Sequence, residues 1–241
     1  KLAHADHLRQ VMVEALDRLP PETPPQDVRN ALTFAVVGAG ASGCELSTKM
    51  ADLLLDAVKR RALQGQPRVL VIEMGGKVVP GMGDQIRELV DDALRLSHVE
   101  VHTLTRVVSV SKDGLTFEHA DQQEELKAAG VVWTGGVKMN PLIEDLDAEK
   151  TSRGLLVIRP TLQLSKFDSV LALGDIAVYP DAAPTLAGTA QLAFQQASLA
   201  ANNVKALISG KQLQTKYFEE LGEAISLGTE RAAVLTAGKA F

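Results

Sequence analysis

The chain has 241 residues, 46% of them hydrophobic and 23% charged, which is ordinary for a soluble globular protein with a sizeable core. A formal net charge of −5 argues against nucleic acid as a partner, because proteins that bind phosphate backbones usually carry a basic surface. The single cysteine, Cys44, excludes an internal disulfide, and no apolar run reaches the roughly 18 residues of a membrane-spanning helix.

Apolar residues recur at helical spacing in residues 1–19, which predicts an amphipathic helix. Two proline pairs then stop the helix, and the segment up to Asn30 is expected to be an extended linker. The five residues Thr33–Val37 predict a short strand that is buried on both faces. A helix over 42–63 and a second strand over 68–72 then complete a βαβ unit.

The turn after the first strand, Gly38-Ala39-Gly40-Ala41-Ser42-Gly43, has the spacing G-x-G-x-x-G. In a dinucleotide site, Gly38 makes the tight turn, Gly40 lets the backbone approach a pyrophosphate, and Gly43 lets the helix pack on the strand. The N-terminus of the helix then faces the phosphates. The second strand ends in Glu73, at the place where a ribose 2′-OH is read. Together these features favour a dinucleotide site over the alternative, a purely structural turn.

The later part of the chain continues the alternation of helices and strands. A helix is expected over 84–96, and the strands of a meander are expected over 99–110 and 115–118. A buried closing strand is expected over 130–133. Trp133, at the end of the closing strand, is expected in the core. After Pro141, the pattern predicts strands over 155–158 and 170–173 and a loop over 179–184. A long helix over 188–207 and a final strand over 225–228 follow.

Five motifs follow one another along the chain: G-A-G-A-S-G-C-E-L, V-L-V-I-E, V-V-W-T-G-G-V-K, L-A-L-G-D and A-Q-L-A-F-Q-Q. With them the sequence resembles the type II NAD(P)H dehydrogenases. These are single-subunit flavoenzymes of the pyridine nucleotide-disulfide oxidoreductase superfamily that reduce quinones at a membrane surface. The segments Leu221–Thr229 and Thr161–Leu164 are similar to the cyanobacterial and plastid branch, which acts on demethylphylloquinone and related prenylquinones.

The resemblance implies an α/β fold with two Rossmann-like dinucleotide-binding domains. It assigns 1–31 to a helix and Pro-rich crossover, 32–148 to a complete NAD(H)-binding domain, and 149–241 to the second part of an FAD-binding domain. Family members carry another G-x-G-x-x-G for FAD near their N-terminus and membrane-binding helices at their C-terminus. The chain is therefore expected to be a fragment that lacks the N-terminal FAD half-domain. This fragment is expected to hold NADH, and whether it retains FAD stays open.

On the NADH side, the resemblance carries over to eight residues. Gly38, Gly40, Ser42 and Gly43 correspond to the family's pyrophosphate turn, and Glu73 corresponds to its ribose-binding acid. Glu45 corresponds to an acid near the nicotinamide and flavin rings. Gly135 and Gly136 correspond to the loop over the nicotinamide. The family usually has Ala-Gly in that loop, so Gly135 is a small departure. A carboxylate at Glu73 would repel a 2′-phosphate, which favours NADH over NADPH. For Glu45, a helix-end carboxylate stabilised by the dipole is the alternative.

On the flavin and quinone side, the resemblance carries over to seven residues. Gly174 and Asp175 correspond to the turn that holds the flavin ribityl chain. Ala190, Gln191 and Leu192 correspond to the backbone beside the isoalloxazine. Gln195 and Gln196 correspond to the quinone pocket. The residues alone favour plainer alternatives. An Asp after a buried strand is a common helix N-cap, and a glutamine pair on an Ala-rich helix is usually surface.

The resemblance implies FAD and NADH as cofactors and a quinone as the electron acceptor. No C-x-x-C motif is present, which excludes a thiol-based disulfide reductase, and the five histidines have no metal-ligand spacing. The whole protein is expected at the surface of a membrane that faces a reducing compartment, and the fragment itself is expected to be soluble. The number of subunits stays open, a homodimer included. Two alternatives remain: an apoptosis-inducing-factor-like NADH oxidoreductase with another acceptor, and a non-catalytic NADH-binding module.

Overall fold

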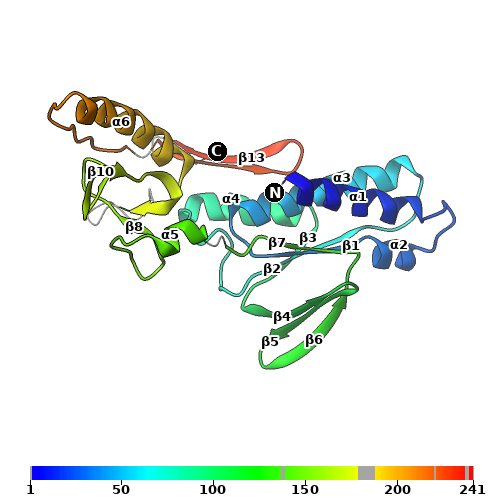
Figure 1. Ribbon diagram of the computed structural model, residues 1–241. Helices are drawn as coiled ribbons and strands as arrows, with labels where there is room; N and C mark the ends of the chain where they lie inside the picture. The colour runs from blue at the N-terminus through cyan, green and yellow to red at the C-terminus, as the bar shows by residue number, and fades with distance from the viewer. Residues whose placement is uncertain (1, 137–138, 179–187, 220, 237–238, 241) are drawn as a thin grey trace. The chain divides into compact units, whose positions relative to one another are not determined.

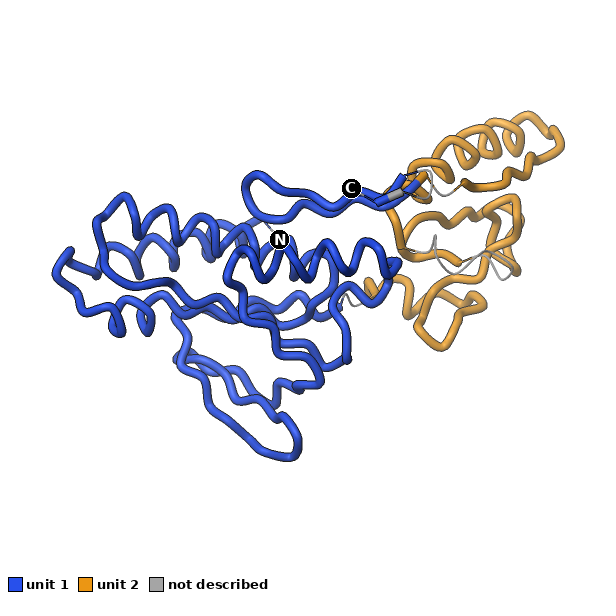
Figure 2. The backbone as a smooth tube through the Cα atoms, turned by 180° about the vertical axis from the view of Figure 1, so that it is seen from behind, with its two compact units in different colours: residues 1–136, 222–241 blue, residues 137–221 orange. Residues whose placement is uncertain are grey.

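The computed structural model describes residues 2–136, 139–178, 188–219, 221–236 and 239–240. The chain forms two compact units (Figure 2). Unit 1 comprises 1–136 together with 222–241, and unit 2 comprises 137–221. The first helix and the C-terminal strands belong to the same compact unit as the glycine-rich turn.

Unit 1 is built on a parallel sheet, as expected from the sequence, and its strand order is β3-β2-β1-β7. The strands are β1 (Thr33–Val37), β2 (Arg68–Ile72), β3 (Val99–His102) and β7 (Gly130–Trp133). In β1 every residue is buried, which accounts for its unbroken apolar sequence. Val37 at its carboxyl end is in register with Ile72 and with Trp133. The residues that follow these three strands therefore meet at one edge of the sheet.

The helices of unit 1 are α1 (Leu2–Asp17), α2 (Pro25–Ala31), α3 (Ala41–Arg60) and α4 (Asp84–Leu96). The predicted first helix and the helices after β1 and β2 are confirmed. The extended linker expected before Asn30 is wrong, because residues 25–31 form α2. Pro25 occupies a first-turn position, where a proline costs no hydrogen bond, and Val28 is completely buried. Burial of Val28 thus stabilises a helix in a segment whose prolines favour a linker in a prediction from sequence.

An antiparallel meander of β4 (Thr105–Ser111), β5 (Gly114–His119) and β6 (Gln122–Lys127) follows β3. The turn at Lys112 and Asp113 joins β4 to β5. Gly114 has a φ of 146°, and a Cβ at this position would overlap the Leu126 carbonyl oxygen. Leu115 and Phe117 pack into one apolar cluster with Ile72 of the parallel sheet.

The C-terminal strands return to unit 1. They are β12 (Glu223–Leu227), β13 (Arg231–Thr236) and β14 (Lys239–Ala240), paired antiparallel in chain order. Ile225, Leu227 and Ala233 are buried in the same core as β1 and α3. Figure 1 shows this hairpin lying along α3 and α4, which β12 and β13 contact. The core of unit 1 is therefore closed by residues more than eighty positions further along the chain than β7.

Unit 2 contains α5 (Pro141–Asp145), β8 (Leu156–Val157), β9 (Gln163–Leu164), β10 (Phe167–Leu171), the 3₁₀ turn η1 (Gly174–Ile176), β11 (Ala177–Val178) and α6 (Ala190–Ile208). Its core gathers the inner faces of these elements, with Leu156, Ile158, Leu162 and Leu164 among its most buried side chains. The expected strand at 170–173 is shifted to 167–171, and it is mostly exposed. The expected helix 188–207 is confirmed as α6. The loop expected over 179–184 lies outside the described residues.

Candidate functional site

The glycine turn joins β1 to α3, and its glycines are held by different constraints. Gly38 has a φ of 102°, and a Cβ there would come within 2.8 Å of the Gly135 nitrogen. A Cβ on Gly43 would overlap the Gly38 carbonyl oxygen, so α3 packs against the turn only because this position is bare. A Cβ on Gly40 would have no neighbouring atom within 4 Å. The backbone at Gly40 is thus open to a ligand.

The N-terminus of α3 offers donors to that open space. Gly40 is the N-cap residue and makes no side-chain cap, and the first turn contains no acidic residue. The Ser42 side chain is exposed in this turn. Uncapped N–H groups at the positive end of a helix dipole attract anions. The bare Gly40 and the uncapped helix end together fit the pyrophosphate of a dinucleotide.

Glu73 follows β2 directly and binds the glycine turn through its carboxylate. The Ala39 N–H donates to Oε2 at 2.7 Å, and the Gly75 N–H donates to Oε1 at 2.7 Å. A carboxylate offers about four lone-pair sites, so two remain for ribose hydroxyls. The acid identified from the sequence therefore lies beside the turn and also holds it in place.

Thr134, which follows β7, was not identified from the sequence. Its hydroxyl Oγ1 lies 2.9 Å from the carbonyl oxygens of Val37 and Gly38, so it ties the end of β7 to the glycine turn. The usable signal was a hydroxyl residue between a strand and two glycines. Gly135 and Gly136 follow it and are exposed, with a φ of 98° at Gly136. Gly135 thus lies directly against the Gly38 turn.

The expectation that Trp133 is a core residue is wrong, because its side chain is 60% exposed. The reason is the strand order: β7 is an edge strand, and its residues 130–132 are only half-buried. The indole Nε1 donates to the Gly135 carbonyl at 3.3 Å. The only tryptophan of the chain therefore stands beside the candidate site, where it can report on binding.

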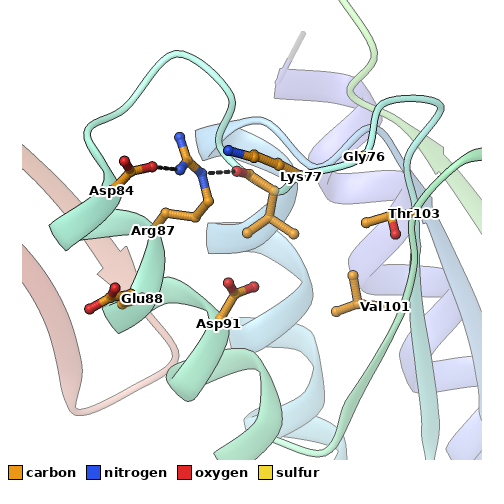
Figure 3. Close-up of a pocket in the computed structure, with 9 residues that line it drawn as sticks. Gly76, Lys77, Asp84, Arg87, Glu88, Asp91, Val101 and Thr103 are labelled. Carbon is orange, nitrogen blue, oxygen red and sulfur yellow. Dashed lines mark hydrogen bonds and ion pairs between the residues drawn. The ribbon is translucent and has the colours of Figure 1, made fainter.

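A cavity of about 420 Å³ opens beside the segment that follows Glu73 (Figure 3). It is lined by residues of the β2–α4 loop, of α4 and of the end of β3: Gly76, Lys77, Val78, Asp84, Arg87, Glu88, Asp91, Val101 and Thr103. The Arg87 guanidinium donates to the carbonyls of Val78 at 3.2 Å and Met82 at 2.8 Å and pairs with the Asp84 carboxylate. Arg87 therefore fixes the loop that forms one wall of the cavity.

Cys44 lies in the first turns of α3 and is completely buried. Its thiol is 3.5 Å from the Ala39 carbonyl oxygen. Burial, reinforced by the negative charge of Asp91, raises the pKa of this thiol to about 12. The thiol therefore stays protonated near neutral pH and acts as a small packed side chain.

Glu45, expected near the nicotinamide, lies in the second turn of α3. Its Oε1 accepts a hydrogen bond from the Ser226 N–H of β12 at 3.0 Å. The structure therefore brings Glu45 to the same end of α3 as the glycine turn. It also ties the carboxylate to the C-terminal hairpin, a contact that the sequence did not indicate.

In unit 2, the structure brings Gly174 and Gln196 together. Gln196 is completely buried, and its Oε1 accepts a hydrogen bond from the Gly174 N–H at 2.7 Å. Its Nε2 is buried and has no hydrogen-bond partner among the described residues. Surface placement, the plainer alternative for the glutamine pair, is wrong for Gln196. A buried donor without a partner beside the Gly174 turn fits a site for a further polar group.

Asp175 lies in η1 and is exposed, and neither η1 nor α6 uses it as an N-cap. Thr189 caps α6 instead, because its Oγ1 accepts from the Leu192 N–H at 3.2 Å. Ala190 and Gln191 begin the helix beside this cap. The capping role that the residues alone favoured for Asp175 is therefore wrong.

The other glutamines of α6 hold the segment that follows the helix. Both ends of the Gln195 amide bind the backbone of Glu219, with Nε2 donating to its carbonyl at 2.8 Å and Oε1 accepting from its N–H at 3.1 Å. The Oε1 of Gln191 accepts from the Leu221 N–H at 3.0 Å. Within unit 2, these two side chains therefore fix the backbone at Glu219 and Leu221.

Comparison with known sequences decides the family. The sequence profile described as pyridine nucleotide-disulphide oxidoreductase matches residues 1–197. The chain belongs to this family. The α/β, Rossmann-like class expected from the sequence is thereby confirmed, and so is the resemblance on which it rested.

Two curated relatives of this family have names that match the expected branch and class. The chain is 30% identical over 204 residues to demethylphylloquinone reductase NdbB of Synechocystis, covering 84% of this chain and 48% of the relative. It is 25% identical over 213 residues to the type II NADH:quinone oxidoreductase of Staphylococcus aureus, covering 87% of this chain and 53% of the relative. The chain thus spans about half the length of the curated relatives it matches.

Two solved structures share the fold of this chain. NDH2 from Plasmodium falciparum in complex with NADH matches with a TM-score of 0.80 at 15% identity, over 98% of this chain and 64% of that one. A NAD-dependent persulfide reductase from A. fulgidus matches with a TM-score of 0.60 at 23% identity, over 84% and 35%. None of the described helices is long and apolar enough to cross a membrane. Within the described ranges, no three His, Cys, Asp or Glu side chains gather as a metal site requires.

Proposed function

We propose that this protein is an FAD-dependent oxidoreductase that transfers electrons from NADH to a membrane quinone. Membership of the pyridine nucleotide-disulphide oxidoreductase family and the names of the two relatives support this assignment. The observation that carries it is the glycine turn, where an open Gly40 backbone, an uncapped helix end and Glu73 meet at one edge of the sheet.

NADH would bind unit 1 across the carboxyl ends of β1 and β2, where parallel sheets place their ligand crevices. The N–H groups of Ser42 and Gly43 would face the pyrophosphate, and Glu73 would accept a hydrogen bond from the ribose. Gly135 and Gly136 would border the nicotinamide, with Glu45 close to the same end of α3. A carboxylate at Glu73 disfavours the extra phosphate of NADPH.

FAD would contact unit 2 at the Gly174–Asp175 turn and at the start of α6, where Ala190, Gln191 and Leu192 lie. When bound, FAD supplies the two-electron exchange between a nicotinamide and a quinone. The protein contributes binding and orientation through its own groups. The partnerless amide of Gln196 beside Gly174 is the observation of this structure that fits such a group.

A prenylquinone of the demethylphylloquinone type is the proposed acceptor, since NdbB of Synechocystis carries that name. Gln195 and Gln196 are proposed to lie on the quinone side. The whole protein is proposed to associate with the membrane surface and to form a homodimer. The resemblance, in which these two positions line the quinone pocket, favours a quinone over the acceptor of an apoptosis-inducing-factor-like oxidoreductase. The non-catalytic alternative is a module that binds NADH and carries no flavin.

The first experiment titrates NADH and NADPH into the purified chain and follows the emission of Trp133. NADH is expected to quench this emission at lower concentration than NADPH. The full-length protein is then tested for the visible absorbance of a bound flavin and for NADH-dependent reduction of a prenylquinone. Colourless protein that still binds NADH would refute the enzyme and leave the binding module. A flavoprotein that oxidises NADH without reducing quinones would favour the other acceptor.

The role of Glu73 is tested with Glu73→Gln, and exposed Glu125 on β6 supplies the matched control Glu125→Gln. The amide removes the negative charge and replaces two accepting oxygens by one. We expect weaker NADH binding and a fall in the preference for NADH over NADPH on the order of tenfold. An unchanged preference would remove Glu73 from the proposed ribose site.

A further inference from the structure

One face of α3 is bonded to the C-terminal hairpin through three consecutive turns. Glu45, Thr48 and Asp52 lie three and four residues apart, so their side chains share that face. They accept hydrogen bonds from consecutive parts of the hairpin: Ser226 N–H to Glu45 Oε1 at 3.0 Å, Gly228 N–H to Thr48 Oγ1 at 2.9 Å, and Thr229 N–H to Asp52 Oδ2 at 2.9 Å. Three backbone donors are thus satisfied by one helix.

The turn of the hairpin is shaped for this contact. Gly228 has a φ of 79°, and a Cβ there would overlap Asp52 Oδ2, so the turn approaches the carboxylate only as glycine. Arg231 lies with its Nη2 3.3 Å from Asp52 Oδ1 and also donates to Ser97 at the C-terminus of α4. The bond between Gly228 and Thr48 is buried, where an unmade hydrogen bond is costly.

The bond at Glu45 concerns the nucleotide site. Glu45 is two residues beyond Gly43, and α3 has no acidic residue in its first turn. Negative side chains are attracted to the N-terminus of a helix, which is also the end that would bind the pyrophosphate. In the structure the Ser226 N–H holds this carboxylate on the hairpin side of α3.

We propose that Thr48 and Asp52 are positioning residues: by docking the hairpin, they keep the Glu45 carboxylate bonded to Ser226 and leave the N-terminus of α3 to the pyrophosphate of the dinucleotide. This inference rests on the proposed NADH site. When the hairpin is loosened, Glu45 gains rotamers that bring its charge closer to the phosphates, and NADH binds more weakly.

The experiment measures the Kd for NADH in Thr48→Val and Asp52→Ala, each with and without Glu45→Gln. Asp56→Ala is the matched control, because Asp56 is an exposed acid on the same helix that pairs with Arg60. We expect each single variant to raise Kd by about two- to fivefold at low salt, the range of a charge effect at a helix end. The increase shrinks at high salt, and Glu45→Gln in the same background removes it.

Other outcomes overturn the inference. An increase in Kd that persists at high salt or with Glu45→Gln would mean that the hairpin supports the fold alone, and no increase would mean that it does not act on the site. Hydrogen exchange of the Ser226, Gly228 and Thr229 amides is the readout that does not depend on NADH. Thr48→Val and Asp52→Ala are expected to raise their exchange, and unchanged exchange would refute the docking role. If the unaltered chain binds no NADH, the proposed function fails instead.

Discussion

The two regions of the chain that the sequence assigns to cofactors differ in how their polar groups are satisfied. Around the glycine turn of unit 1, Glu73 and Thr134 from the neighbouring strands bind the turn itself. At the Gly174 turn of unit 2, Gln196 binds the turn with one end of its amide and leaves the other end buried without a described partner. Within the described residues, side chains from neighbouring strands hold the first turn in place, whereas the second turn is bonded by an amide that has one end unsatisfied.

The difference follows from strand order, because parallel strands that end in register bring together the residues that stabilise a binding turn. In unit 1, three parallel strands end in register, so residues far apart in the chain stabilise one turn. In unit 2, β9 and β10 form a two-stranded sheet, and Phe167 and Val170 of β10 are 37% and 40% exposed. Preorganisation lowers the cost of binding, so unit 1 is expected to bind its nucleotide unaided.

The largest effect is expected for Gly43→Ala, which disrupts the preformed glycine turn of unit 1. The added Cβ overlaps the Gly38 carbonyl oxygen, and the forced backbone shift costs about 1–3 kcal/mol or more. Urea unfolding measures this loss. The control is Gly40→Ala, whose Cβ meets nothing within 4 Å. It should leave the stability unchanged and weaken NADH binding by about tenfold, or about 1.4 kcal/mol. Equal stability of the two variants would contradict the packing argument.

Gln196→Ala tests the unit 2 side. It leaves the Gly174 N–H without its acceptor, and we expect a loss of about 1–3 kcal/mol in the free energy of unfolding of unit 2. Asn202, an exposed amide on the same helix, gives the control Asn202→Ala, with an expected change within about 0.5 kcal/mol. Hydrogen exchange of β10 and α6 separates this loss from any change in unit 1. Faster exchange in both units would show that the two units do not unfold independently.

A smaller effect is expected from pH, through Glu100 on β3. Its partial burial would raise the pKa, but hydrogen bonds and charges from Arg68 and Arg29 outweigh burial and hold the pKa below the usual 4.5. A carboxylate with a depressed pKa stabilises the fold above that value and loses its contribution as pH falls through the folded-state pKa. Thermal unfolding should therefore show Glu100→Gln to be less stable at neutral pH, with the gap closing below about pH 4.5. A gap that is constant with pH would exclude this ion pair as the cause.

The smallest effect is an absence of reaction at Cys44. Since burial raises the pKa of its thiol to about 12, a thiol reagent at pH 8 should leave the folded chain unlabelled and react on unfolding. Gly43→Ala should speed the labelling, because it disturbs the same turn of α3. Rapid labelling of the unaltered chain would show that the first turns of α3 open more readily than the contacts of the glycine turn imply.

The βαβ unit of the first site could be predicted from the sequence alone. Thr33–Val37 is apolar throughout most of its length because β1 is buried on both faces, and the glycines are required by local sterics, which a sequence records directly. Glu73 could be found because its role depends on a fixed place at the end of a strand. The helix over 25–31 and the exposure of Trp133 were missed, since burial of Val28 and the edge position of β7 depend on neighbours distant in the chain.

The place of the last strands and the partners of the polar helix side chains depend on the tertiary fold and could not be predicted. The segment 222–236 follows unit 2 in the chain and packs into the core of unit 1, because Ile225, Leu227 and Ala233 are buried there. Glu45, Thr48 and Asp52 give no local sign that they meet a hairpin about 180 residues away. Periodicity and sterics are local properties of a sequence, whereas the partner of a hydrogen bond is chosen by the fold.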